Sequence, residues 1–192
     1  MSKLTQVCSK VSIAERNERN GHRGQIIWLT GLSGAGKSTI AMALERRLFS
    51  DGRQVYVLDG DIVRTGLCQD LGFSSEDRSE NIRRIGEVAR IMANSGLCVI
   101  VAFISPFRID RDKVRDAMPE SCFIEVYVNA SLEVCQKRDT KGLYARAIRG
   151  EIADFTGISS PYEPPVSPEV ELNTARLSET EAVDRLVSFL NQ

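Results

Sequence analysis

The sequence predicts an α/β protein in which helices flank a central parallel sheet in three layers. Strand-like and helix-like segments alternate along the chain, which is the pattern of parallel strands joined by crossover helices. Residues 97–103 are continuously apolar, as expected for a strand that helices cover on both faces. The 192 residues contain neither an internal repeat nor a linker-like stretch, so we expect one domain over 1–192.

The first third of the chain is expected to contain two helices and two strands. Residues 1–24 form a helical lead-in, in which a capping box at Ser12–Glu15 starts a helix that stops near Gly21. After it we expect a strand at 25–30, a helix at 38–50 and a second strand at 54–59.

The remaining chain continues this alternation. Apolar residues recur at helical spacing within 81–94, which predicts a helix there. Four of the six prolines fall within 161–168, so we expect a shaped loop. The other expected elements are strands at 97–103, 122–128 and 169–173 and a closing helix that begins at the capping box Ser178–Glu181.

The composition is typical of a soluble globular domain, with 42% hydrophobic and 27% charged residues. A net charge of −1 provides no general attraction to nucleic acid or to an anionic membrane. We expect neither a signal peptide nor a membrane span, because residues 1–24 are polar and no apolar run approaches the ~18 residues that a span needs. The five cysteines form no C-x-x-C pair, which favours reduced thiols in a cytoplasmic protein. The single histidine, His22, excludes histidine-ligated metal sites and Ser-His triads.

The strongest motif is the glycine-rich stretch GLSGAGKST, which matches G-x-x-x-x-G-K-[ST] between a strand and a helix. Its glycines allow backbone N–H groups to surround a phosphate at a helix N-terminus. Lys37 is predicted to reach the β- and γ-phosphates, and Ser38 is predicted to bind Mg²⁺ through its hydroxyl. The flanking elements argue against a chance glycine-rich turn. The predicted nucleoside-triphosphate site consists of Gly31, Leu32, Ser33, Gly34, Ala35, Gly36, Lys37, Ser38 and Thr39.

Such a site is compatible with a kinase, a GTPase switch or a motor that couples ATP to nucleic acid. The GTPase class is disfavoured because the sequence contains no Asn-Lys-x-Asp motif. A nucleic-acid motor usually requires a larger chain and a basic patch. A small-molecule kinase requires neither, but it needs an acceptor site opposite the nucleotide.

The stretch VLDGDIVR, residues 57–64, supplies candidates for that acceptor site. Asp59 and Asp61 leave a predicted strand at its carboxyl end, the edge at which doubly wound sheets bind ligands. One carboxylate can orient Mg²⁺ through water, and the other can accept the proton of an attacking hydroxyl. Arg64, one helical turn later, would face an anionic acceptor. A polar helix start is the alternative interpretation of these residues.

A second polar segment, residues 72–84, carries Phe73 in a loop and Arg78 and Asn81 at i, i+3 on one helix face. A charged helix start that only faces solvent would look the same. The combination also suits an anion held by arginine and a base stacked on phenylalanine.

The motifs, taken in order, resemble those of adenylyl-sulfate kinases. Besides GLSGAGKST and LDGDIVRTGL, the chain contains DLGFSSEDRSENIRRIGEVAR, FISPFR, RDTKGLY and GEIADFTGISSPYEPP in the order found in that family. The similarity includes the lead-in SIAERNERNGHRGQIIWLTG and therefore covers nearly the whole chain. Generic P-loop kinases share the first motif only, whereas DGD-x-x-R, GF-x-x-x-DR-x-EN and FTGI-x-x-PYE are specific in combination.

The resemblance implies a P-loop kinase fold and transfer of the ATP γ-phosphoryl group to the 3′-hydroxyl of adenosine 5′-phosphosulfate, which gives 3′-phosphoadenosine 5′-phosphosulfate and ADP. It also implies dependence on Mg²⁺ and a homodimer, with small-molecule substrates and no nucleic-acid or membrane partner. Two other functions stay open: a P-loop kinase with a sugar or acid acceptor, and an ATP-binding regulatory protein that has lost turnover.

The resemblance also assigns catalytic roles. Asp61 resembles the acidic residue near the acceptor hydroxyl, and Asp59 is expected to support Asp61 or to contribute to the coordination shell of the metal. Lys37 is expected to interact with the γ-phosphoryl group. Ser105 matches a serine proposed to form a phosphorylated intermediate in bacterial members. In-line transfer between two bound substrates needs no such intermediate, so we expect Ser105 to contribute its backbone beside the acceptor.

Binding roles follow from the same resemblance. Phe73 and Phe155 are expected to sandwich the acceptor's adenine, with Phe155 on a lid and not in the core. Segment 138–168 is expected to form this lid and the acceptor-site loop. The other acceptor-side residues are Arg64, Arg78 and Asn81 as a phosphosulfate clamp, with Ile104, Ser105 and Lys141. The nucleotide side adds Arg138 and Thr174.

The sequence departs from the family pattern at two places. Asn173 in VELNT replaces a more usual aspartate, and the run YARAIRG is less regular than the common pattern. Both departures concern the adenine contacts of ATP and the lid, and neither touches the chemistry. No sulfurylase domain is recognisable, so we do not expect the bifunctional form of the enzyme.

Overall fold

The computed structural model describes residues 9–119 and 121–192, and a single parallel sheet forms the middle layer of this part of the chain. The strands lie in the order β2-β3-β1-β4-β5, and every pair is parallel. This arrangement confirms the predicted fold class. The strands are β1 (Gln25–Thr30), β2 (Val55–Asp59), β3 (Cys98–Ala102), β4 (Phe123–Asn129) and β5 (Val170–Asn173).

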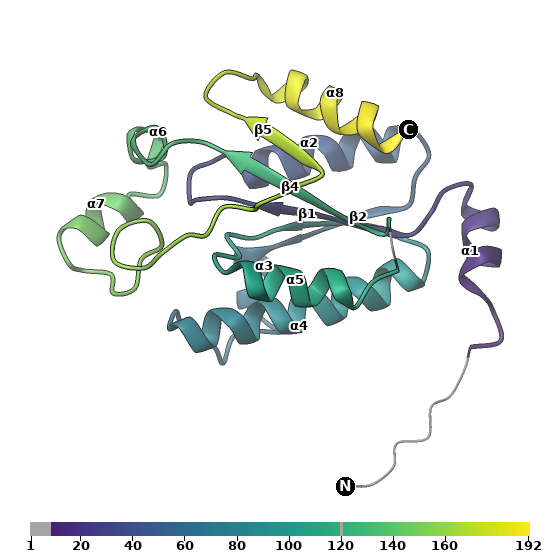
Figure 1. Cartoon of the computed structure of the whole chain (residues 1–192), viewed down its shortest axis with the longest axis horizontal. Coiled ribbons are helices and arrows are strands. Elements are labelled where there is room, and N and C mark those ends of the chain that lie inside the picture. Colours follow the sequence, from purple (N-terminus) through teal and green to yellow (C-terminus); the bar gives the residue numbers. More distant parts are fainter. Residues whose placement is uncertain (1–8, 120) are drawn as a thin grey trace, which may run out of the picture.

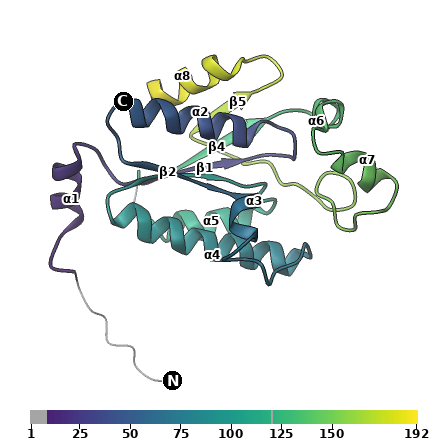
Figure 2. The same ribbon diagram turned by 180° about the vertical axis from the view of Figure 1, so that it is seen from behind.

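Helices cover both faces of the sheet. Helices α2 (Lys37–Ser50) and α8 (Glu179–Leu190) lie on one face, and α4 (Ser75–Asn94) and α5 (Arg108–Asp116) lie on the other (Figure 1). The two views agree that α1 (Ile13–Asn20) lies at one end of the sheet, whereas α6 (Leu132–Arg138) and α7 (Leu143–Ile148) lie at the other (Figure 2). Helix α3 (Gly60–Arg64) follows β2 directly.

The central strand β1 divides the core into two apolar clusters. Ile27 and Leu29 join the cluster beneath α2 and α8, whereas Ile26 and Trp28 join the cluster beneath α4 and α5. This alternation follows from the period of two in a strand, because successive side chains point to opposite faces. All six residues of β1 are buried, as expected for a strand with helices on both sides.

Helices α4 and α5 differ from the sequence-based expectation. Helix α4 begins at Ser75, well before the expected start at 81, because the Ser74 hydroxyl caps it by accepting a hydrogen bond from the Asp77 N–H. Its first turns carry charged residues and little apolar signal. Helix α5 was not predicted, because its sequence RIDRDKVRD is mostly charged, although Asp110 and Arg111 are buried.

The other predicted elements correspond closely to the structure. Strand β3 is one residue shorter at each end than the expected 97–103, and β4 is shifted by one residue from the expected 122–128. The short helices α3 and α7 were not predicted. No helix in the described ranges is long and apolar enough to cross a bilayer.

Candidate active site

A cleft of about 1200 Å³ lies at the carboxyl ends of the strands. Its walls come from the glycine-rich loop of residues 31–39 (the P-loop), from α3 and α4, from the loop after β3 and from the segment that follows α6. The predicted site residues that line it are Ser33, Gly34, Gly36, Lys37, Ser38, Thr39, Asp59, Asp61, Arg64, Phe73, Arg78, Asn81, Ile104, Ser105, Arg138, Lys141, Phe155 and Thr174. Gly31 and Ala35 are the buried members of the P-loop that do not line this cleft, and Leu32 lines a separate shallow hollow.

Side chains that line the cleft bind the backbone carbonyls of the P-loop. Its five consecutive carbonyls, from Gly31 to Ala35, each accept a side-chain hydrogen bond. With the carbonyls engaged, the N–H groups are left for an anion. The donors are Lys37 Nζ to residues 31 and 32 at 2.9 and 2.8 Å, Tyr144 Oη to 33 at 3.0 Å, Arg138 Nη1 to 34 at 3.2 Å and Thr174 Oγ1 to 35 at 2.8 Å.

A close contact also fixes the P-loop against α6. Gly34 has a φ of 75°, and a Cβ at this position would lie 3.2 Å from the carbonyl oxygen of Cys135. A side chain at residue 34 would therefore be strained and would push the loop away from α6.

Lys37 is buried at the base of the P-loop. Burial lowers the pKa of its ammonium group to about 8, although Cys135 and Asp59 partly oppose this change. A bound phosphate would favour the charged form, because an opposite charge compensates for the lost hydration.

Asp59 connects the P-loop to α3. Its carboxylate accepts hydrogen bonds from Ser38 Oγ at 2.7 Å and from the N–H of Asp61 at 3.0 Å, which caps α3. Asp61 itself is exposed and forms an ion pair with Lys141, which lies just before α7. The pair joins the two sides of the cleft between α3 and the segment before α7.

Two arginines surround Phe73 on the α3 and α4 side of the cleft. The guanidinium carbons of Arg64 and Arg78 lie 4.4 and 5.6 Å from the centre of the ring, which is 56% exposed. Arg64 Nη1 also donates to the carbonyl of Gly72 at 2.9 Å. Partial burial lowers the pKa of both guanidiniums. Arginine nevertheless keeps its charge at neutral pH, and an anion bound at this wall would compensate for the lost hydration.

The expectation that Phe155 lies outside the core is wrong. Its side chain is 7% exposed, belongs to the cluster beneath α2 and α8, and packs edge-on against Tyr144 with ring centres 5.0 Å apart. Because Phe155 also lines the cleft, stacking of a base on it stays a prediction.

The hydroxyl of Ser105 is directed into the protein. Ser105 Oγ accepts a hydrogen bond from Trp28 Nε1 at 3.0 Å, and the residue is buried. Its φ of 40° is unusual for a residue with a side chain. The Ser105 carbonyl accepts from Arg111 Nη1 at 2.7 Å, which helps to hold this backbone geometry.

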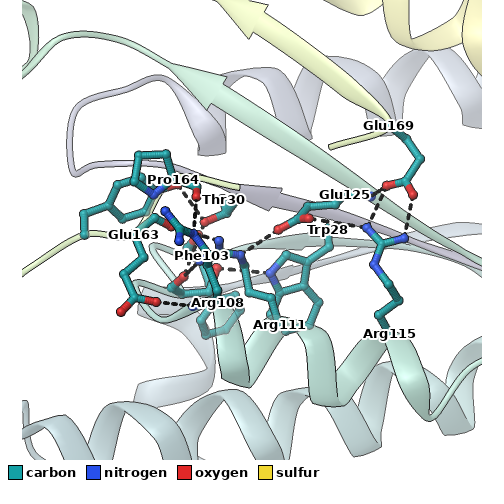
Figure 3. Close-up of polar contacts among 12 residues, drawn as sticks. Trp28, Thr30, Phe103, Arg108, Arg111, Arg115, Glu125, Glu163, Pro164 and Glu169 are labelled. Atoms are coloured by element: carbon teal, nitrogen blue, oxygen red, sulfur yellow. Dashed lines mark hydrogen bonds and ion pairs between the residues drawn. The ribbon is translucent and has the colours of Figure 1, made fainter. Parts of the chain in front are cut away.

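A buried ion pair supports the loop after β3 (Figure 3). Arg111 Nε lies 2.6 Å from Glu125 Oε1, and both side chains are almost fully buried. Arg111 Nη2 donates to the carbonyl of Glu163 at 2.9 Å, so the same guanidinium joins the loop after β3 to the proline-rich segment. Glu125 continues the network through Arg115 to Glu169.

Sequence reasoning missed the residues that support the site from behind. Tyr144 and Arg111 donate to backbone carbonyls of the site, Trp28 donates to Ser105 Oγ, and Glu125 pairs with Arg111. The only available signal was the position of Tyr144 within the family motif RDTKGLY.

Comparisons with known proteins identify a family. Residues 23–173 match the family model described as adenylylsulphate kinase. The adenylyl-sulfate kinase of Acaryochloris marina is 55% identical over 184 residues, which are 96% of this chain and 90% of that protein. The structure of the Mycobacterium tuberculosis APS kinase in complex with AMPPNP and APS is 45% identical, with a TM-score of 0.85, and the match covers 88% of this chain and 99% of that one. A hexameric APS kinase from Thiobacillus denitrificans is 37% identical with a TM-score of 0.67, covering 93% of this chain and 31% of that one.

Burial of Lys37 leads to a testable pH dependence. Because the pKa of Lys37 is lowered to about 8, the ligand-free protein loses this charge as the pH rises above that value. We expect ATP affinity to be constant below pH 8 and to fall by about tenfold per pH unit above it. Calorimetric titration between pH 7 and 9.5 would measure this change. Lys37→Met should bind ATP weakly without the same pH dependence and turn over roughly 10²-fold more slowly. An equal decline in both proteins would assign the effect to another group.

The orientation of Ser105 leads to a second expectation. Ser105→Ala should keep turnover within about tenfold, because its hydroxyl bonds to Trp28. The melting temperature should fall, since the Trp28 N–H loses its partner at a cost of about 1–3 kcal/mol. Trp28→Phe is the matched control, because it removes the same hydrogen bond from the other side. A drop of more than about 10³-fold in rate, with an unchanged melting temperature, would instead support a phosphorylated serine.

Proposed function

This chain belongs to the adenylylsulphate kinase family, and on that premise we propose how its cleft divides the reaction among its residues. The reaction is transfer of the γ-phosphoryl group of ATP to the 3′-hydroxyl of adenosine 5′-phosphosulfate, which yields 3′-phosphoadenosine 5′-phosphosulfate and ADP. The observation that carries the proposal is that the P-loop and the wall of Arg64, Phe73 and Arg78 line one cleft.

On the nucleotide side, the P-loop N–H groups and Lys37 would bind the phosphates of ATP. Ser38 Oγ and Asp59 Oδ2, 2.7 Å apart, offer the oxygen ligands that Mg²⁺ prefers when phosphates and water complete its shell. The bound ion would neutralise charge on the β- and γ-phosphates. Arg138 and Thr174 act on this side by holding the carbonyls of Gly34 and Ala35.

On the acceptor side, Arg64 and Arg78 would bind the phosphosulfate, and Asn81 would complete this clamp. Asp61 would orient the attacking 3′-hydroxyl and take its proton. Lys141 would leave its ion pair with Asp61 to stabilise the transferred phosphoryl group, whose charge spreads over its oxygens in a loose transition state. Ile104 and Ser105 would contribute backbone groups beside the acceptor.

One assay separates this activity from its alternatives. ADP release would be followed with ATP and Mg²⁺ against adenosine 5′-phosphosulfate, AMP, gluconate and shikimate. We expect turnover with adenosine 5′-phosphosulfate. Turnover only with another acceptor would indicate a different P-loop kinase, and no turnover with any acceptor would indicate a regulatory ATP-binding protein.

The assembly and location of the protein are further parts of the proposal. The family resemblance supports a cytoplasmic homodimer, and the hexameric relative from Thiobacillus denitrificans indicates that such chains can assemble. Light scattering of the purified full chain would measure the mass of the assembly.

Asp61 provides a test of the acceptor mechanism. Asp61→Asn should lower the maximal rate roughly 10²–10⁴-fold, because the amide cannot take the hydroxyl proton. Acceptor binding should change far less. A rise in the acceptor's Michaelis constant at an unchanged maximal rate would make Asp61 a binding residue. Lys141→Ala is the companion variant, because it leaves the Asp61 carboxylate in place.

Phe155 is expected to affect both stability and binding. Phe155→Ala should lower stability by about 3–5 kcal/mol, because it creates a cavity beside Tyr144. It should also weaken acceptor binding by roughly ten- to a hundredfold through lost stacking. Phe155→Leu is the control, because it fills much of the space without an aromatic face. Normal acceptor affinity in Phe155→Leu would limit Phe155 to a packing role.

A further inference from the structure

Two buried polar atoms in the cleft have no hydrogen-bond partner. Within the described residues, these atoms are Asn81 Oδ1 and Thr156 Oγ1. The side chains are 4% and 1% exposed, and both line the cleft. Buried polar groups in native proteins are nearly always satisfied, so an unpaired one requires an explanation such as a ligand.

The chemistry of the two atoms restricts the kind of ligand. An amide oxygen only accepts hydrogen bonds, whereas a hydroxyl can donate or accept. A phosphosulfate group at neutral pH presents acceptors, and it cannot satisfy Asn81 Oδ1. The ligand must therefore also carry N–H or O–H groups, which the amino group of adenine and the ribose hydroxyls supply.

The loop that carries Thr156 is held by hydrogen bonds at several points. Arg78 Nη2 donates to the carbonyl of Asp154 at 2.7 Å, and the Phe155 N–H donates to Ser159 Oγ at 2.9 Å. Farther along, Arg111 donates to the carbonyl of Glu163, as the close-up shows (Figure 3). A loop fixed in this way holds Thr156 in the wall of the cleft, and preorganisation of this kind reduces the cost of binding.

The wall of Arg64, Phe73 and Arg78 does not explain how the protein would distinguish adenine from other bases. Arg64 and Arg78 interact with charge, and an aromatic face accepts any base because every base has a π-face. In these roles the arginines are engaged with the phosphosulfate and the rings with the face of the base, so neither reads the base edge, which requires a further hydrogen-bonding group. Thr156 directly follows Phe155, the expected stacking surface, and its hydroxyl is unpaired.

We infer that the Thr156 hydroxyl hydrogen-bonds to the edge of the acceptor's adenine and is a recognition residue for the nucleoside part of adenosine 5′-phosphosulfate. The inference rests on the proposed function. It assigns to Thr156 a role distinct from the phosphosulfate clamp and from the stacking rings.

The test compares Thr156→Val with Thr156→Ser in the full chain. Thr156→Val removes only an unsatisfied hydroxyl, so the melting temperature of the ligand-free protein should stay constant or rise. The Michaelis constant of adenosine 5′-phosphosulfate should rise about two- to tenfold, as expected for one neutral hydrogen bond. The maximal rate and the Michaelis constant of ATP should not change. Thr156→Ser keeps the hydroxyl and should retain most of the affinity.

Thr30→Val is the matched control for stability. Thr30 is also fully buried, but its hydroxyl donates to the carbonyl of Ile104 at 2.7 Å. Its removal should therefore lower the melting temperature, in contrast to Thr156→Val. Opposite signs for the two variants would show that only the Thr156 hydroxyl lacks a partner in the ligand-free protein.

AMP serves as the second probe, because it carries the adenosine but no sulfate. Thr156→Val should weaken AMP binding by the same factor as adenosine 5′-phosphosulfate binding. An unchanged affinity for both compounds, or a loss confined to the sulfated one, would overturn the inference. If the wild-type protein does not phosphorylate adenosine 5′-phosphosulfate, the proposed function fails, and the AMP titration still tests Thr156.

Discussion

The site depends on the hydrogen bonds that hold the P-loop carbonyls. Five successive carbonyls accept side-chain hydrogen bonds, and their donors come from α2, α6, α7 and the residue after β5. A glycine-rich loop has high conformational freedom on its own, and ordering it costs entropy. The surrounding side chains offset that cost before ATP arrives. They also explain why residues at 138, 144 and 174, far from the P-loop in sequence, belong to the same functional unit.

A buried ion pair is usually weak evidence for stability, because desolvation offsets much of the attraction. The pair of Arg111 and Glu125 has a clearer effect on the position of nearby loops than on stability. The guanidinium also donates to the carbonyls of Ser105 and Glu163, so its planar fork sets the relative position of two loops. An apolar replacement would leave these two carbonyls without their donor. The backbone geometry of Ser105, including its positive φ, is therefore supported by a guanidinium whose partner, Glu125, lies on β4, two strands away from β3.

Features that depend on short stretches of sequence could be predicted from the sequence alone. The P-loop, the five parallel strands and the cleft-lining positions of Asp59, Arg64 and Arg78 follow from motif spacing and from the edge rule for parallel sheets. The sequence did not predict α5, because that helix is anchored through charged residues and lacks an apolar stripe. Nor did it predict the burial of Phe155, because only the folded chain brings Tyr144 against it. Whether a hydroxyl such as that of Thr156 finds a partner is likewise a property of tertiary structure.

The strand order also has a consequence for how the protein is made. β1 and the P-loop are synthesised early, but β3 and β4, the strands that pair with β1, are encoded much later in the chain. Thr174, which donates to the Ala35 carbonyl, follows β5 and is therefore encoded later still. Parallel pairing over such sequence separations is intrinsically slow. The P-loop therefore obtains the donor to its Ala35 carbonyl only after the 139 residues that lead to Thr174 have been synthesised.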